Sequence, residues 1–148
     1  MNKANYSAPY YSQLDGRWSG VWLGTGSFGA TGCVPATMSM IISAIKGQTI
    51  TPIQVGNYLY YNTLEFNHSY LGTSSHGIVF SARNWGLKTE ALNSQEAIAK
   101  ALQDGYYVAA AVGGPSRYIV AGGHEIVLKG YSNGNTYVLD PYNPGNNG

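Results

Sequence analysis

Apolar positions along the chain follow a helical period in the first two thirds and a strand-like pattern in the last third. Met38, Ile41, Ile42 and Ile45 recur at helical intervals, and Gly47 supplies a left-handed C-terminal stop. Three further helices are expected, over residues 53–59, 75–85 and 94–104. The second helix is capped by Thr51-Pro52, and the last one is opened by a capping box formed by Asn93 and Glu96.

The last third is typical of an antiparallel sheet. Residues 106–112 are almost continuously apolar and predict a central strand, while residues 124–131 and 136–140 form a hairpin around Asn133-Gly134. Elsewhere we expect an edge strand in the arm 1–12, a glycine- and serine-rich loop over 19–32, and a short strand over 87–92. The fold class is therefore α+β, with an N-terminal helical part packed on a C-terminal antiparallel sheet.

Length and composition limit both the number of domains and the classes of partner. A chain of 148 residues suits one domain, which we place at 1–141, with 142–148 beginning a linker or disordered tail. With a net charge of +1 and only 10% charged residues, the sequence has no basic stripe for a nucleic-acid backbone and no polybasic cluster for an anionic membrane, so we expect neither as a partner. No apolar run approaches the roughly 20 residues that span a bilayer. The 13 tyrosines favour either a surface for a polar, uncharged ligand or simple filling of strand faces.

The only cysteine, Cys33, lies where the glycine-rich loop becomes a helix. Pro35 suits the first turn of that helix, so Cys33 is expected at its N-terminus, where the dipole and free amides lower the pKa of a thiol below about 8.5. The alternative is a small buried apolar residue without chemistry. The glycines of the preceding loop would let another molecule's backbone approach closely, which favours a nucleophile.

The three histidines differ in their surroundings. His68 lies in a polar loop and is expected to be solvated, and His76 begins a helix, where a cap or a loop contact is the simplest role. His124 instead opens an apolar strand directly after Gly123, and Asp140 closes the partner strand. A plain two-residue loop would put His124 and Asp140 on opposite faces, so a Cys–His–Asp site requires an odd-length loop or a bulge in the hairpin.

Four segments, taken together and in this order, resemble the bacteriocin-processing (double-glycine) peptidase-like family of papain-fold cysteine peptidases. They are residues 10–18, 31–38, 123–131 and 138–141. The resemblance implies a papain-like fold with Cys33 as nucleophile, His124 as general base and acid, and Asp140 as the residue that orients the histidine. It also implies that the Gln13 side chain and the Cys33 amide form the oxyanion hole; without the resemblance, Gln13 reads as a turn residue making a local bond. The chain departs from the family at Val34, where glycine is frequent, and in its long gap between Gln13 and Cys33.

The expected reaction is hydrolysis of a peptide bond without a metal or other cofactor. We expect the substrate to be a peptide of bacterial peptidoglycan, in the stem or the cross-bridge, cut by a monomeric lytic enzyme such as an endolysin, to which a cell-wall-binding module can be joined. Trp22, Gly32 and Gly123 would line the substrate approach. Without a signal peptide, such an enzyme would be made in the cytoplasm and reach the wall after lysis or release. The alternatives are an amidase, a leader-peptide or protein-processing peptidase, and a non-catalytic binding module on the same scaffold.

Overall fold

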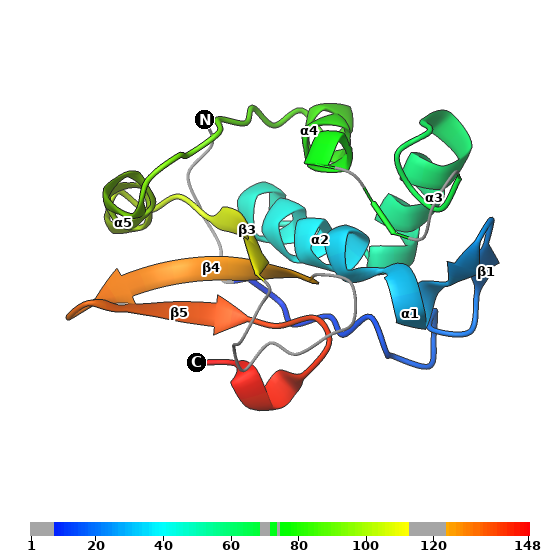
Figure 1. Cartoon of the computed structure of the whole chain (residues 1–148), viewed down its shortest axis with the longest axis horizontal. Coiled ribbons are helices and arrows are strands. Elements are labelled where there is room, and N and C mark those ends of the chain that lie inside the picture. Colours follow the sequence, from blue (N-terminus) through cyan, green and yellow to red (C-terminus); the bar gives the residue numbers. More distant parts are fainter. Residues whose placement is uncertain (1–7, 69–71, 74, 113–123) are drawn as a thin grey trace.

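The computed structural model describes residues 8–68, 72–73, 75–112 and 124–148. In chain order the elements are β1 (Trp22–Leu23), β2 (Gly26–Ser27), α1 (Phe28–Thr31), α2 (Cys33–Lys46), α3 (Pro52–Asn62), α4 (Ser75–Asn84), α5 (Gln95–Gln103), β3 (Val108–Val112), β4 (His124–Ser132), β5 (Asn135–Leu139) and a 3-10 turn, η1 (Pro144–Asn146). Figure 1 shows helices α2, α3 and α4 above the sheet, with η1 below it. The expected mixture of helices followed by an antiparallel sheet is confirmed.

Helix α2 is the centre of the fold. Residues 34–44 are all buried, because α3 and α4 pack on one side of the helix and β4 on another. Its C-terminus is the expected left-handed Gly47, with φ of 66°. Within the core formed around α2, the rings of Phe28 and Phe66 meet edge to face at 6.3 Å. The nucleophile candidate Cys33 therefore begins an element that the rest of the core holds rigidly.

The described strands of the larger sheet run in the order β3-β4-β5, all antiparallel. Strand β3 lies at an edge of this sheet, so the prediction of a central strand there is wrong. Alternate residues serve two different cores: Val127 and Leu139 face α2, whereas Ile126, Leu128 and Val138 pack with Leu102 of α5. Both faces of the sheet are thus covered, which is why β4 reads as a nearly continuous apolar run.

The hairpin between β4 and β5 contains the irregularity that a shared site required. Its loop is the two-residue Asn133-Gly134, and the pairing is regular up to Gly130 opposite Tyr137. The register then shifts between Leu128 and Gly130, so that Val127 lies opposite Leu139. This bulge moves Asp140 to the face of the sheet that carries His124. The sequence-based prediction of an odd loop or a bulge is confirmed.

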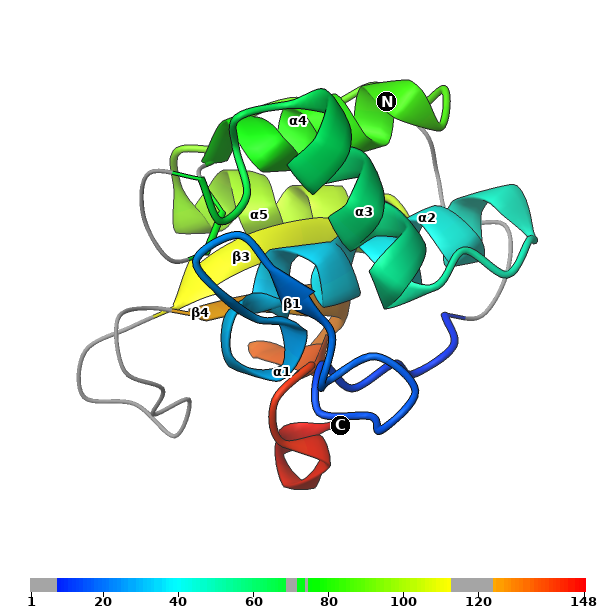
Figure 2. The same ribbon diagram turned by 90° about the vertical axis from the view of Figure 1, so that its right-hand side faces the viewer.

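The C-terminal residues 142–148 differ from the expected linker or disordered tail. They fold back beside β5, where Val138 and Gly148 exchange two backbone hydrogen bonds of 3.2 Å. Asn143 caps η1 by accepting from the Gly145 amide at 2.9 Å. Figure 2 shows this turn on the far side of the molecule from α4. The segment is part of the domain, and it contacts the site described below.

Several local predictions also need correction. The expected loop over 19–32 contains β1, β2 and α1, the arm forms no strand over residues 8–12, and residues 87–92 form no strand. Residues 1–7 lie outside the described part of the chain. Helix α5 is capped by Ser94, whose hydroxyl accepts from the Ala97 amide at 3.1 Å, and not by Asn93. The capping box found in the structure is the one between Thr51 and Gln54 at the start of α3.

Candidate active site

Cys33 lies at the N-terminus of α2, as its position before Pro35 predicted. Gly32 is the N-cap and has no side chain, so backbone amides of the first turn remain available to the sulfur. The prediction of a lowered thiol pKa is nevertheless wrong for this arrangement. Burial raises the pKa of Cys33, and the charge of Glu125 raises it further, against the opposing effect of hydrogen bonds from backbone amides of Glu125, Val34 and Cys33. The cost of burying a charged thiolate therefore outweighs the stabilisation that the N-terminus of α2 gives it.

His124 and Asp140 form a buried pair. The imidazole Nε2 lies 2.7 Å from Oδ1 of Asp140, and both side chains are at most 2% exposed. His124 is the first residue of β4, and Asp140 directly follows β5. The Tyr142 ring meets the imidazole edge to face at 6.3 Å. A carboxylate so placed fixes the tautomer of the histidine and stabilises its protonated form.

Asp140 is held as a carboxylate by a complete set of donors. Oδ1 also accepts from the backbone amides of Tyr142 and Asn143 at 2.9 and 3.3 Å, and Oδ2 accepts from the Asn146 side chain at 2.8 Å. Burial alone would raise the pKa of Asp140, but the hydrogen bonds from Asn146, His124 and the Tyr142 amide together lower it. The folded C-terminal segment therefore supplies much of the environment that keeps this group charged.

The residue that connects the two halves of the site is Glu125. Its amide bonds the sulfur of Cys33, and its carbonyl accepts from the Thr37 hydroxyl at 3.1 Å. Cys33 and Thr37 are four residues apart on α2, so one face of the helix docks on the backbone next to His124. Figure 1 shows β4 passing beneath α2, and it starts on the side where α1 meets α2.

The second nitrogen of the imidazole is uncommitted. Nδ1 of His124 is buried and has no hydrogen-bond partner in the part of the chain that the structure describes, Cys33 included. A nitrogen in this position can accept the thiol proton, whereas Nε2 is already occupied by Asp140. Catalytic hydrogen bonds are often long before substrate binds. The unpartnered Nδ1 of His124 and the raised pKa of Cys33 both indicate that the thiol of the free protein is protonated.

Gln13 is buried beside both halves of the site. Its backbone amide donates to the Pro141 carbonyl at 2.7 Å, and its Nε2 donates to the Gly29 carbonyl at 3.0 Å, four residues before Cys33. Oε1 is buried without a partner among the described residues. The structure thus fixes Gln13 between the strand end and the loop before α2. One hydrogen on Nε2 remains for an oxyanion, so the role in the oxyanion hole stays a prediction.

The three residues expected to line the substrate approach have different surroundings. Trp22 is 67% exposed on β1, and its indole donates to the Gly24 carbonyl at 2.8 Å. At Gly32 an added Cβ would lie 2.6 Å from the Phe28 carbonyl oxygen, so close packing alone accounts for the glycine. Gly123 lies outside the described residues. Contact of these residues with a substrate stays a prediction.

The other two histidines lie apart from these groups. His68 is not simply solvated: its Nε2 lies 2.7 Å from the Tyr60 carbonyl oxygen, and its ring stacks on that tyrosine at 4.5 Å. His76 is exposed at the start of α4, with Nδ1 3.9 Å from Glu65. Across the described ranges, no group of three or more His, Cys, Asp or Glu side chains is placed to hold a metal ion.

Reasoning from the sequence missed two groups of contacts at the site. Tyr10 donates to the Asp140 carbonyl at 2.6 Å, and Asn147 accepts from the Asp140 amide at 2.8 Å. The pattern Asn143-Pro-Gly-Asn146, with an Asx residue before proline, was a signal for an ordered turn. Glu125 was also overlooked, because it appeared only as one polar position in an apolar strand.

Comparisons with known proteins agree with this arrangement. Residues 6–148 match the profile of the Peptidase_C39 like family. The chain belongs to this family. A crystal structure described as a C39-like peptidase from Bacillus anthracis superposes with a TM-score of 0.58, at 15% identity, covering 97% of this chain and 84% of that one. No curated protein matches the sequence.

Family membership and the shared fold support the expectation of a papain-like cysteine peptidase. In the described ranges, no helix has the length and apolar character needed to cross a membrane. The bond that the enzyme cuts is a separate question, to which the geometry of the site contributes.

Proposed function

We propose that the protein hydrolyses a peptide bond of bacterial peptidoglycan, with Cys33 as nucleophile, His124 as base and then acid, and Asp140 as the orienting residue. The observation that carries the catalytic part is the buried His124–Asp140 pair with Nδ1 left over, one residue from the backbone amide that bonds the Cys33 sulfur. His124 Nδ1 takes the thiol proton while the sulfur attacks the carbonyl carbon.

The tetrahedral oxyanion then forms at the N-terminus of α2. The Cys33 amide and the remaining Nε2 hydrogen of Gln13 are the donors we propose for it, each contributing roughly 10²–10³ in rate. Protonated His124 gives its proton to the leaving amine, which departs and leaves a thioester. Water, deprotonated by the same imidazole, then releases the acid and restores the thiol.

The substrate class is inferred from the composition of the chain and of the segment before Cys33. Wall peptides are rich in alanine and glycine, and the segment before Cys33 is rich in small residues, with Gly29 and Gly32 within four positions. The low content of charged residues, 10%, fits a substrate recognised mainly through its backbone. A leader-peptide or protein-processing peptidase is the alternative, because nothing in the catalytic groups distinguishes the two.

The test is digestion of purified cell walls from several bacteria, followed by mass analysis of the released fragments. We expect fragments that end at a newly cut peptide bond with the wild-type protein, and none with Cys33→Ala. The position of the new amino group separates endopeptidase from amidase. If no wall preparation releases fragments, while an unrelated peptide library is cut, the peptidoglycan proposal is wrong and the processing alternative stands.

A further inference from the structure

Glu125 is a buried carboxyl group that the proposed mechanism does not use. The residue is only 7% exposed, and its backbone is fixed on both sides, by the Cys33 sulfur and by the Thr37 hydroxyl. Its side chain belongs to the face of the sheet opposite to His124, since the two residues are consecutive on β4. This is the face covered by α2, and the charge of Glu125 acts on Cys33.

This carboxyl group has no protein partner among the described residues. In the described part of the chain it makes no hydrogen bond or ion pair, whereas Asp140 accepts from four donors. Burial raises the pKa of Glu125 to about 7. When ionised, it raises the pKa of Cys33 and so opposes the thiolate that the reaction needs. A buried carboxylate is normally paired, so an unpaired one beside a nucleophile points to a partner supplied from outside.

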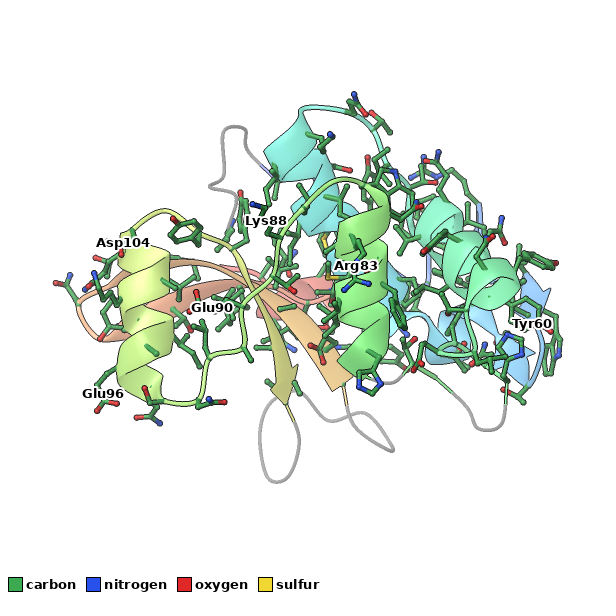
Figure 3. The ribbon with its side chains drawn as sticks, turned by 90° about the horizontal axis from the view of Figure 1, so that it is seen from above. Tyr60, Arg83, Lys88, Glu90, Glu96 and Asp104 are labelled. Atoms are coloured by element: carbon green, nitrogen blue, oxygen red, sulfur yellow. The ribbon has the colours of Figure 1, made fainter. Side chains whose placement is uncertain are left out.

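A groove opens beside this position, and residues next to Glu125 and Thr37 line it. It encloses about 580 Å³ along α2, between α4 and β3, and its walls include Met38, Ile45 and Ala111. Ala111 is the cross-strand partner of Glu125, and Met38 follows Thr37 on α2. Figure 3 shows β3 between α4 and α5, with the connecting segment that carries Lys88 and Glu90.

We propose that Glu125 is a specificity residue that binds an ammonium group of the substrate next to the scissile bond. This rests on the proposed function for the identity of the reaction. An ammonium donates hydrogen bonds to the carboxylate and cancels its charge, and so removes the unfavourable influence of Glu125 on the Cys33 thiolate. The amines of diamino acids in wall peptides have this chemistry. A neutral substrate would leave the carboxylate unpaired.

The first experiment needs no substrate. Cys33 is treated at pH 8 with two methanethiosulfonates of similar size, the cationic 2-aminoethyl and the anionic 2-sulfonatoethyl reagent, and the two rates are compared. The wild-type protein should prefer the cation, and Glu125→Gln should lower the ratio of rates by about tenfold, as expected for one charge near the sulfur at an intermediate dielectric. Glu96→Gln, the same change at an exposed position of α5 outside the groove, should leave the ratio unchanged.

An equal ratio in the wild-type protein and in Glu125→Gln would overturn the proposal, because the carboxylate would then not act at the reacting sulfur. Glu125→Met serves as a second variant, since it removes the buried charge without leaving a polar group unpaired. Circular dichroism confirms that each variant is folded before it is labelled.

The second experiment uses purified wall peptides in three forms: untreated, acetylated on their amines, and converted to acetamidines. The last two modifications have nearly the same shape, but only the amidine keeps the positive charge. The wild-type kcat/KM should fall about tenfold or more on acetylation and much less on amidination, as expected for loss of a hydrogen bond to a charged group. Glu125→Gln should cut the three forms at similar rates.

Equal rates of the wild-type protein on acetylated and amidinated peptides would overturn the proposal, because charge would then not matter. Glu96→Gln should discriminate as the wild-type protein does. If the wild-type protein cuts no wall peptide in any form, the proposed function fails, and the ratio of reagent rates alone decides the role of Glu125.

Discussion

Two buried acidic groups lie on opposite faces of the same sheet, and the protein treats them in opposite ways. Asp140 accepts four hydrogen bonds and has a lowered pKa, whereas Glu125 has none among the described residues and a pKa raised to about 7. The first is therefore ready to stabilise a charged histidine in the free protein. The second is the group that we propose receives the charge of a substrate. The contrast separates a carboxylate that the fold itself stabilises from one that it does not.

The largest expected effect comes from removing the reacting groups themselves. Cys33→Ala and His124→Ala should each lower hydrolysis of wall peptides by at least about 10³-fold, because nucleophile and base act as a unit. Release of new amino groups from purified walls measures this. Cys33→Ala should also unfold within a few degrees of the wild-type temperature. Activity retained in Cys33→Ala would place the chemistry elsewhere.

Removing Asp140, the acidic group with four hydrogen bonds, should lower both activity and stability. Asp140→Ala removes the partner of a histidine that is 1% exposed and ends the 2.8 Å hydrogen bond from the Asn146 side chain. We expect a loss of about 4 kcal/mol in the free energy of unfolding, measured by urea denaturation. Asp104→Ala breaks an exposed ion pair with Lys100 and is the matched control, expected to cost less than about 1 kcal/mol.

Glu125, the acidic group without hydrogen bonds, should lower the stability of the folded protein when it is ionised, whereas ionised Asp140 stabilises it. Because the pKa of Glu125 is raised from 4.5 to about 7, the folded state binds the proton more tightly than the unfolded state between these values. Stability contributed by the protonated group is thus lost as the pH rises through this window, by about 3 kcal/mol at most. Glu125→Gln should lose correspondingly less stability than the wild-type protein between pH 4.5 and 8 in urea titrations. Parallel losses in the two proteins would show that Glu125 is paired in solution.

The smallest effect is expected from removing Asn146, one of the four donors to the Asp140 carboxylate. Asn146→Ala removes one of four hydrogen bonds to the carboxylate and should cost about 1–2 kcal/mol of stability. It should also raise the pKa of Asp140, since a donor to the charged form is lost. The pH dependence of unfolding below pH 5 reports this shift. An unchanged acid limb would mean that the C-terminal turn does not tune Asp140.

The sequence predicted those features that depend on local pattern. The position of Cys33 before Pro35 and the stop at Gly47 define α2, and chain order together with alternation predicted the hairpin and its bulge. The bulge could be inferred because side chains alternate strictly, so a shared face for His124 and Asp140 admits few registers.

Features that depend on long-range burial could not be predicted. The helix N-terminus suggested a lowered pKa for Cys33, but the degree of desolvation is set by α3, α4 and β4 packing around α2. Strand β3 reads as central because both its faces are covered, although one of its edges has no partner strand in the described sheet. The C-terminal residues reveal their role only through contacts with Asp140.

The central claim is that His124 draws the proton from Cys33, and the rate of Cys33 alkylation by iodoacetamide across pH 5–10 tests it most directly. The account predicts that His124 speeds alkylation of the wild-type protein near pH 7, because the imidazole takes the thiol proton as the sulfur attacks, and that His124→Gln reacts only at higher pH, once the thiol, whose pKa is raised by burial, is ionised. Superimposable profiles for the two proteins would contradict it.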